Sequence, residues 1–306
     1  MKAAQISKYG GSEVVEINRS APKPTASAGR LLVEVCAAGV NPVDWKIRQG
    51  FMAKMSPLQF PATLGGDFSG VVEEVGAGVT AFKKDDEVYG RGTGSFAEFI
   101  SADAKVTARK PKNIHHIEAA ALPLTGVSAL QALTEHIGIT KGKQILIHGG
   151  AGGIGTMAIQ LAKHLGAHVA TTASDKDKKY VKKLGADEIM DYKKQSFEDL
   201  IHDYDAVYDT VGGDTYTRSY KVLKKGGIIV SMLEQPNSEL MKRYEVKAIG
   251  QFTQANNERL SKLTELVEKG AVKVHVYRTF PLEQAREALD YQQQGKARGK
   301  VVIKIT

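Results

Sequence analysis

Residues 144–167 are QILIHGGAGGIGTMAIQLAKHLGA, a short apolar run followed by a glycine cluster and a segment with helical spacing. The run 145–147 predicts a buried strand, and the apolar residues over 159–165 predict a helix. A glycine-rich turn between a strand and a helix is where parallel α/β folds bind nucleotide phosphates. We therefore expect a dinucleotide-binding unit here, and the alternative is a purely structural turn.

Three glycines in this turn, Gly150, Gly152 and Gly155, have the spacing G-x-G-x-x-G. We expect Gly150 to allow the tight turn and Gly152 to let the backbone approach a pyrophosphate. Gly155 should let the helix pack closely on the strand. The free N–H groups and the positive dipole end of the helix would then face the anion.

The composition limits the classes of protein to which this chain can belong. The chain has 306 residues, of which 42% are hydrophobic and 25% charged, as in ordinary globular proteins with room for two domains. It contains no apolar run of membrane-span length, and its first ten residues, MKAAQISKYG, contain no apolar signal core. Cys36, the one cysteine in the sequence, excludes an internal disulfide framework and a multi-cysteine zinc cluster. These features predict a cytoplasmic protein that does not enter a membrane.

The net charge of +8 comes from 42 basic and 34 acidic residues. The lysines are dispersed, and the densest group, at 176–183, is interrupted by Asp175 and Asp177. This pattern favours a solvated helix face, with room for a local anion site, over a surface for nucleic acid.

The first 110 residues predict a compact β-rich domain. Apolar runs at 31–35 and 71–75 are bounded by glycines, and no long helical period occurs before Ile117. A helical pattern then covers 118–136, where we expect Pro123 and Gly126 to break or kink the helix.

After the glycine turn, helices alternate with strands. The predicted strands are His168–Thr172, Glu188–Asp191, Asp205–Asp209 and Gly227–Ser231. This alternation predicts a doubly wound parallel sheet.

The remaining residues return to a mixed pattern. We expect a helix over 257–269 ended by Gly270, a strand over 272–277, a helix over 282–294 and a last strand over 301–305. The last segment should rejoin the first domain. The expected organisation is therefore a catalytic domain of residues 1–120 plus 255–306, with a nucleotide-binding domain of residues 121–254 inserted in it.

The residue after the second strand of the nucleotide-binding domain decides the preferred cofactor. An NAD enzyme usually has an acidic residue there, about 20 residues beyond the glycines, to bind the ribose hydroxyl. In this chain the position falls at Ser174, whose small side chain leaves room for a 2′-phosphate that Lys176 or Lys178 could neutralise. Asp175, one residue later, is the competing acid, and a shift of one residue would reverse the prediction. The sequence favours NADPH.

Several motifs resemble the medium-chain dehydrogenase/reductase superfamily, and the similarity is closest to its quinone oxidoreductase and enone or alkenal reductase branch. It extends over nearly the whole chain. The motifs are RLLVEVCAAGVNPVDWKIRQG at 30–50, PATLGGDFSGVVEEVGAGVTAFKKDDEVYG at 61–90, GSFAEFI at 94–100, ALPLTGVSALQAL at 121–133, DYKKQSFEDL at 191–200, DAVYDTVGG at 205–213 and GKARGKVVI at 295–303. The resemblance implies a GroES-like β-rich catalytic domain with an inserted Rossmann domain, a cleft between them for NADPH and substrate, and a homodimer.

The resemblance also separates this chain from zinc alcohol dehydrogenases. Those enzymes have a cysteine at the position of Asn41 and a histidine at the position of Gly66, and they carry a four-cysteine lobe. Neither an amide nor a glycine supplies the thiolate or imidazole that zinc needs. The sequence therefore predicts no metal site.

Without zinc, the reaction that fits is hydride transfer to an activated acceptor, either a quinone or an α,β-unsaturated carbonyl. The protein then has to align the nicotinamide with the acceptor and exclude water. An enoyl-thioester reductase is an alternative, although the sequence does not place a tyrosine acid near the nicotinamide. A third alternative is a nucleotide- or RNA-binding protein without enzymatic activity, as among the crystallin relatives of this family.

The resemblance gives individual residues a role. The pair Gly153 and Ile154 corresponds to residues at the pyrophosphate. Lys46, in NPVDWK, corresponds to a lysine that reaches the nicotinamide ribose in enone reductases. Asn41 and Thr125 correspond to residues that line the nicotinamide end.

For the 2′-phosphate, the corresponding residues are Ser174, Lys178 and Tyr192. Three of the site residues also have an ordinary structural interpretation. Asn41 could end a strand in a turn, Thr125 could cap a helix break, and Tyr192 could be a surface residue. His148, next to the glycines, is interpreted as a packed residue and not as an acid catalyst.

Overall fold

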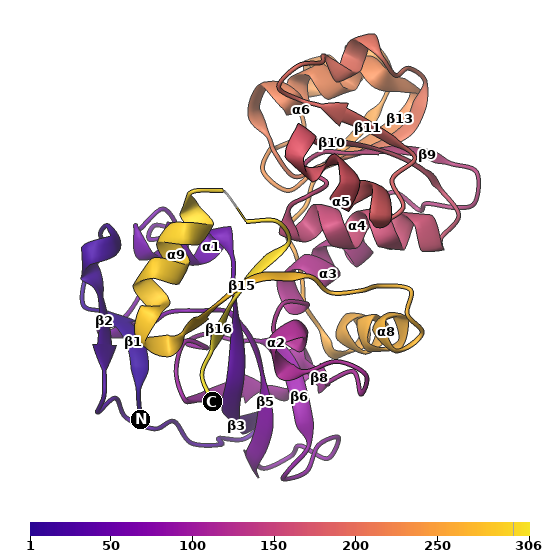
Figure 1. Ribbon diagram of the computed structural model, residues 1–306. Coiled ribbons are helices and arrows are strands. Elements are labelled where there is room, and N and C mark those ends of the chain that lie inside the picture. Colours follow the sequence, from indigo (N-terminus) through magenta and orange to yellow (C-terminus); the bar gives the residue numbers. More distant parts are fainter. Residues whose placement is uncertain (296) are drawn as a thin grey trace. The chain divides into compact units, whose positions relative to one another are not determined.

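The structure of the protein is a computed structural model that describes residues 1–295 and 297–306, so Lys296 of the C-terminal motif lies outside the described residues. The chain divides into two compact units (Figure 1). Unit 1 comprises Met1–Leu124, Ala255–Lys269 and Val274–Thr306, and unit 2 comprises Thr125–Gln254 and Gly270–Lys273. The sequence places the boundaries near 120 and 254, and it assigns 270–273 to the first domain.

Unit 2 is built on a six-stranded sheet within residues 125–254, all of which are described. Its strands are β9 (Gln144–Ile147), β10 (His168–Ala173), β11 (Glu188–Asp191), β12 (Tyr204–Asp209), β13 (Leu223–Ser231) and β14 (Lys247–Gly250). The order is β11-β10-β9-β12-β13-β14, and all neighbours are parallel. The four strands predicted after the glycine turn are confirmed. The order reverses direction between β9 and β12, and such a switch point is where open α/β sheets bind ligands.

Strand β14 was missed because its sequence, KAIG, contains too few apolar residues to form a pattern. It lies at the edge of the sheet, where burial on one side is lost.

Helices cover both faces of this sheet. In Figure 1, α4 (Gly153–His164) and α5 (Lys178–Lys183) lie on one side, and α6 (Gly213–Ser219) lies on the other. Helix α7 (Ser238–Tyr244) contacts β13. The buried core between these layers includes Leu146, Ala170, Val207, Tyr220 and Ile229.

The helical region before β9 differs from the sequence prediction. It forms α2 (His116–Ala119), α3 (Pro123–Leu130) and a π-helical segment, Gln131–His136. Pro123 begins α3, since the first turn of a helix tolerates a missing N–H, and Gly126 lies within the same helix without breaking it.

Unit 1 contains two sheets among its described residues. The smaller sheet has the order β2-β1-β4. The larger has the order β15-β16-β3-β5-β6-β8, and β7 also pairs with β3. The strands are β1 (Ala3–Ile6), β2 (Val15–Asn18), β3 (Arg30–Val40), β4 (Ala62–Thr63), β5 (Asp67–Val75), β6 (Glu87–Arg91), β7 (Phe99–Asp103), β8 (Thr107–Arg109), β15 (Val276–Pro281) and β16 (Lys300–Lys304).

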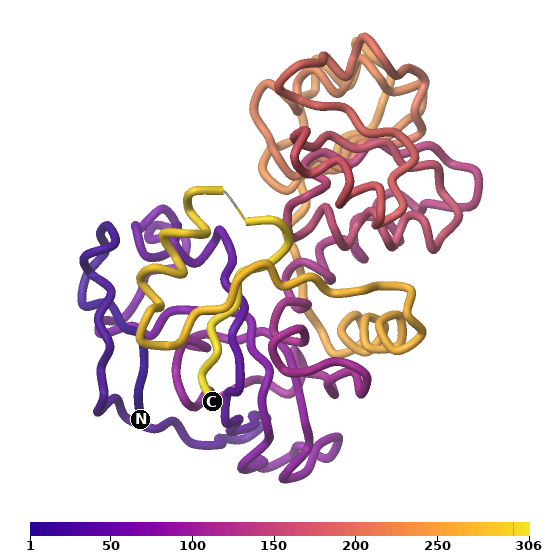
Figure 2. Tube along the Cα trace, viewed as in Figure 1, coloured from indigo at the N-terminus to yellow at the C-terminus, as the bar shows by residue number. Residues whose placement is uncertain are grey.

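The C-terminal segment returns to the first strands, as predicted. Strand β16 pairs antiparallel with β3 and parallel with β15. Helix α9 (Ala285–Gln293) packs against β2 and α1 (Pro42–Arg48), and Figure 2 shows this yellow segment beside the indigo N-terminal chain.

The four C-terminal elements differ from the prediction in their bounds: α9 begins three residues later than predicted, and β16 lies one residue earlier. Helix α8 (Asn257–Glu268) ends one residue early, and β15 begins four residues later than predicted. Val272 is buried, which explains the apolar pattern there, but pairing with β16 starts only at Val276.

Candidate functional site

The glycine loop lies at the switch point of the unit 2 sheet, between β9 and α4. Gly149 has φ = +68°, so it makes the tight turn that the sequence assigned to Gly150. Gly150 is required for another reason, because a Cβ at this residue would overlap the Thr171 hydroxyl. A Cβ at Gly155 would overlap the Gly149 carbonyl, so close packing of helix and loop requires glycine there.

Helix α4 offers its N-terminus to a ligand. Gly152 is the N-cap, and no side chain caps the helix. The first-turn amides, which include those of Gly153 and Ile154, have no acceptor within the helix. A Cβ at Gly152 would meet only the Gly149 carbonyl, at 3.2 Å, so the loop is open on its outer side. This arrangement fits a pyrophosphate.

The register of the sheet brings two predicted phosphate residues together. Ala173, at the end of β10, is paired with Asp191, at the end of β11. Ser174 and Tyr192 directly follow these two residues, so they lie at neighbouring strand ends. Tyr192 is 59% exposed, and its phenol is open to solvent.

Both acidic and basic side chains surround Ser174. Its hydroxyl donates to Oδ2 of the buried Asp177 at 2.6 Å. The Lys178 ammonium lies 3.3 Å from the Asp175 carboxylate. Lys176 is exposed and belongs to the same turn. The sequence did not assign a role to Asp177, which the turn Asp175–Asp177 folds back onto Ser174.

In unit 1, Asn41 is the N-cap of α1, and Pro42 begins that helix. The Asn41 N–H donates to Oδ2 of Asp44 at 2.7 Å. Asn41 is therefore a helix cap and not merely a turn. The sequence missed α1 as a helix because seven residues are too few to establish a period.

The Asn41 side chain is held at both ends. Its Nδ2 donates to Oδ2 of Asp67 at 2.9 Å, and its Oδ1 accepts a hydrogen bond from Lys300 Nζ. Lys300 Nζ also donates to the Val40 carbonyl at 3.0 Å. Asn41 is 1% exposed, so its amide serves this internal network.

The network contains four ionisable side chains, Asp44, Asp67, Arg91 and Lys300. Arg91 Nε lies 3.1 Å from Oδ1 of Asp67. Burial raises the pKa of Asp44 to about 7 and lowers the pKa of Lys300, and the nearby Asp67 and Asp44 carboxylates oppose that lowering. Sequence reasoning missed these partners, although a lysine at the start of the apolar strand 300–304 is a signal for a buried charge.

The Arg91 guanidinium lies beside Gly66. A Cβ at Gly66 would come within 3.2 Å of Arg91 Nη2 and 3.9 Å of Asp44 Oδ1. A side chain at residue 66 would therefore lie next to the Arg91 cation.

Lys46 follows Trp45 on α1, and its ammonium lies 5.7 Å from the centre of the Trp45 ring. The Trp45 ring itself meets the ring of Phe51 edge-on at 6.2 Å. Phe51 is 69% exposed. Lys46 therefore belongs to a half-exposed cationic and aromatic surface. Thr125, which the resemblance assigns to the nicotinamide end together with Asn41, belongs to unit 2, where it lies buried in α3.

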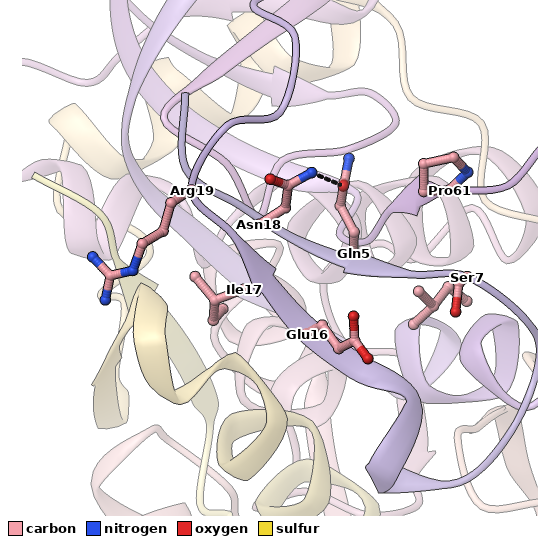
Figure 3. Close-up of a pocket in the computed structure, with 8 residues that line it drawn as sticks. Gln5, Ser7, Glu16, Ile17, Asn18, Arg19 and Pro61 are labelled. Carbon is pink, nitrogen blue, oxygen red and sulfur yellow. Dashed lines mark hydrogen bonds between the residues drawn. The ribbon is translucent and has the colours of Figure 1, made fainter.

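A surface hollow of about 460 Å³ lies elsewhere in unit 1, on β1 and β2 (Figure 3). Glu16, Asn18 and Arg19 line it, and Asn18 Nδ2 donates to Oε1 of Gln5 at 2.9 Å. None of the predicted site residues lines this hollow.

No group of three or more His, Cys, Asp or Glu side chains in 1–295 and 297–306 is arranged to hold a metal ion. Over the same ranges, no helix is long and apolar enough to cross a membrane.

The sequence matches two protein families. Residues 27–112 match the alcohol dehydrogenase GroES-like domain, and residues 184–303 match the family described as zinc-binding dehydrogenase. The second description names a metal, whereas the two zinc-ligand positions that the resemblance identifies are Asn41 and Gly66 in this chain.

Whole-chain relatives include two plant reductases. The chain is 39% identical to a 2-methylene-furan-3-one reductase of Solanum lycopersicum and 38% identical to an NADPH-dependent alkenal/one oxidoreductase of Arabidopsis thaliana. Each match covers 99% of this chain and 79% of the relative. Among solved structures, the quinone oxidoreductase of Coxiella burnetii is 35% identical, with a TM-score of 0.93 over 100% of this chain and 99% of that one.

Proposed function

Because this chain belongs to the medium-chain dehydrogenase/reductase superfamily, in the branch of quinone and alkenal/one oxidoreductases, we propose that it reduces a quinone or an α,β-unsaturated carbonyl with NADPH. The observation that carries the proposal is the uncapped N-terminus of α4 behind an open glycine loop. Bound NADPH supplies a hydride from its nicotinamide. The acceptor carbon takes the hydride, its conjugated oxygen takes the negative charge, and a proton from solvent or a ribose hydroxyl completes the reduction.

We assign the cofactor to unit 2. The backbone of Gly152, Gly153 and Ile154 would bind the pyrophosphate, while Gly150 and Gly155 keep the loop close to the sheet. The 2′-phosphate is assigned to Ser174, Lys178 and Tyr192, and Lys176 could replace Lys178. The adjacent ends of β10 and β11 support this assignment.

For the nicotinamide end we retain Asn41, Lys46 and Thr125. Lys46 is the candidate for the ribose, since its ammonium lies on a half-exposed surface of α1. Asn41 is proposed to act through its position. Its amide is bonded to Asp67 and Lys300, so it can shape the wall of the site without a free polar group.

We propose that the reaction needs no zinc. An amide at residue 41 and a glycine at residue 66 supply neither thiolate nor imidazole. The Arg91 cation beside Gly66 further disfavours a divalent cation at this point. The acceptor must therefore already be electrophilic.

A homodimer that extends the unit 2 sheet is also proposed. Strand β14 lies at the edge, where its outward N–H and C=O groups can pair with a second copy. Phe252, just beyond this strand, is 74% exposed, and Leu233 is 51% exposed.

We place the activity in the cytoplasm because the sequence has a single cysteine, and no role in nucleic-acid binding is assigned to its dispersed charge.

Steady-state assays of NADPH and NADH oxidation test the proposal. The acceptor panel contains quinones, short enones and enoyl thioesters. We expect NADPH-dependent turnover of quinones or enones. If no acceptor in the panel supports the oxidation of NADPH, the enzymatic assignment is overturned. If only enoyl thioesters are reduced, the proposed substrate class is replaced by that one.

A further inference from the structure

His148 lies between β9 and the glycine loop, and it is completely buried. Its Nδ1 is 3.1 Å from the Thr172 hydroxyl, at the end of β10. Its Nε2 is 2.9 Å from the hydroxyl of Ser219, the last residue of α6. The imidazole therefore joins two elements on either side of the strand that carries the loop.

The direction of these hydrogen bonds follows from the hydroxyl groups. Ser219 Oγ donates to the Thr215 carbonyl at 2.7 Å, and a hydroxyl has one hydrogen to give. His148 Nε2 must therefore carry a hydrogen and donate to Ser219. Burial, with the nearby Arg218 cation adding to it, lowers the pKa of His148 to about 3, so the ring is neutral and Nδ1 is an acceptor.

The hydrogen bonds continue from His148 through Thr172 to the glycine loop. Because Nδ1 accepts, the Thr172 hydroxyl gives its hydrogen to His148. The Thr172 oxygen then accepts the Gly149 N–H, at 3.1 Å. Gly150 N donates to the Thr172 carbonyl at 3.0 Å, so both residues of the turn are fastened to Thr172.

The ring has little freedom to adopt another arrangement. Phe197 packs edge-on against it, with the ring centres 4.7 Å apart. The His148 N–H donates to the Tyr208 carbonyl, and its own carbonyl accepts from the Thr210 hydroxyl at 2.8 Å. Its backbone is thus tied to β12 and to the loop after that strand.

We propose that His148 is a positioning residue of the cofactor loop: as the neutral Nε2–H tautomer it orients the Thr172 hydroxyl, which holds the Gly149 amide and the turn at the start of α4. This inference rests on the proposed function, since it assigns the loop to NADPH. It adds that the loop geometry depends on Ser219, a residue that does not touch the loop.

The first test uses the protein without cofactor. Nitrogen-15 NMR of the histidine side chains should show His148 as the Nε2–H tautomer. Hydrogen exchange should show a protected Gly149 amide. A protonated ring, or a hydrogen on Nδ1, would overturn the proposal.

Variants of Thr172 then test whether its hydroxyl holds the loop in position or the side chain only fills space. Thr172→Val removes the hydroxyl, so Gly149 exchange should accelerate and the Kd for NADPH should rise about tenfold, as for the loss of one buried hydrogen bond. Thr172→Ser keeps the hydroxyl and should retain Gly149 protection. Unchanged exchange and unchanged Kd in folded Thr172→Val would contradict the role assigned to Thr172.

Ser219→Ala is the decisive variant. Without its acceptor, the Nε2 hydrogen is left unsatisfied in the interior, and we expect the ring to shift toward the Nδ1–H tautomer. The Nδ1–H group would then donate to the Thr172 oxygen and compete with the Gly149 N–H for it, so Gly149 exchange should accelerate. A residue that merely packs would leave the tautomer unchanged, and that result would overturn the proposal.

The two proposals fail in different ways. If the wild-type protein does not bind NADPH, the assigned cofactor is wrong, while the tautomer and the Gly149 exchange still decide the role of His148. If NADPH binds but Ser219→Ala leaves both readouts unchanged, only the role of His148 is wrong.

Discussion

The Ser174 hydroxyl donates to the Asp177 carboxylate at 2.6 Å, three residues further along the same turn. This bond places a buried negative charge beside the residue assigned to the 2′-phosphate of the cofactor. An anion next to a phosphate weakens binding, so Asp177 opposes NADPH in the proposed site, whereas Ser174 and the nearby lysines are proposed to favour it.

The first prediction concerns that charge. Asp177→Asn keeps an acceptor for Ser174 and removes the charge, so the Kd for NADPH should fall about fivefold, or roughly 1 kcal/mol, while the Kd for NADH stays the same. Fluorescence titration with both cofactors measures this. Lys183→Gln, at the exposed end of α5, is the charge-changing control. Equal effects on NADPH and NADH would place the 2′-phosphate elsewhere.

Gly152 and Gly155 should respond differently to alanine. Gly155→Ala forces the loop away from α4, so both the Tm of the free protein and NADPH affinity should fall. A Cβ at Gly152 meets only the Gly149 carbonyl, in a tight contact at 3.2 Å, so Gly152→Ala should lower the Tm less than Gly155→Ala does, and it should also lower NADPH affinity. Thermal unfolding and cofactor titration of the two variants give the comparison. A Gly152→Ala variant with wild-type affinity would contradict close approach of the pyrophosphate.

The third prediction concerns the buried cation of β16. Lys300→Met leaves Asp44 and Asp67 with one cation fewer, and should lower the free energy of unfolding of the protein by about 3 kcal/mol. Lys304→Met, at the exposed end of the same strand, should change it by less than about 0.5 kcal/mol. Urea unfolding monitored in unit 1 measures both. Similar values for the two variants would mean that the Lys300 contacts do not stabilise the fold.

His148 predicts a pH dependence of stability. Its pKa is about 3 in the folded protein and about 6.5 when unfolded, so the unfolded state binds the proton first as the pH falls. Above about pH 6.5 the imidazole is neutral in both states, so the buried ring does not lower the free energy of unfolding there. Between pH 7.5 and pH 5.0 the free energy of unfolding should drop by about 2 kcal/mol on this account.

Replacing the imidazole should remove that part of the pH dependence. His148→Asn should show a smaller drop between the same two pH values, whereas His164→Asn, at an exposed residue of α4, should keep the wild-type drop. If His148→Asn and wild type lose equal stability, the ring is not kept neutral by its surroundings.

The last prediction concerns metal. Dialysis against a strong chelator should leave NADPH-dependent turnover of quinones or enones unchanged, because residues 41 and 66 offer no zinc ligand. The rate before and after dialysis, and after added zinc, checks this. A loss of activity that zinc restores would overturn the zinc-independent assignment.

The sequence predicted those parts of the fold that have a strong local signal. Strands β9 to β13 are apolar runs between turns, and that pattern predicted their existence and parallel arrangement, although β13 begins four residues earlier than predicted. The sequence could not show which of the two adjacent glycines, Gly149 or Gly150, makes the tight turn. Neither has a side chain, and only the folded backbone shows that Gly149 is the one with positive φ.

The site was harder to predict where it depends on distant residues. Lys300 and Asn41 are 259 positions apart, and their contact exists only because β16 pairs with β3. His148 was expected to be a packed residue, and it is, but its hydroxyl partners on β10 and α6 follow from tertiary structure alone. No local pattern contains either relationship.

The position of β16 between β3 and β15 also has a consequence for synthesis on the ribosome. The strands of unit 2 lie within one continuous stretch, so this sheet can form while the chain is still being made. The larger sheet of unit 1 cannot close until residues 300–304 have left the exit tunnel. Until then the segment 37–40 of β3 has an open edge and Asn41 lacks its hydrogen bond from Lys300. The nascent chain then carries a folded unit 2 while the larger sheet of unit 1 is still incomplete.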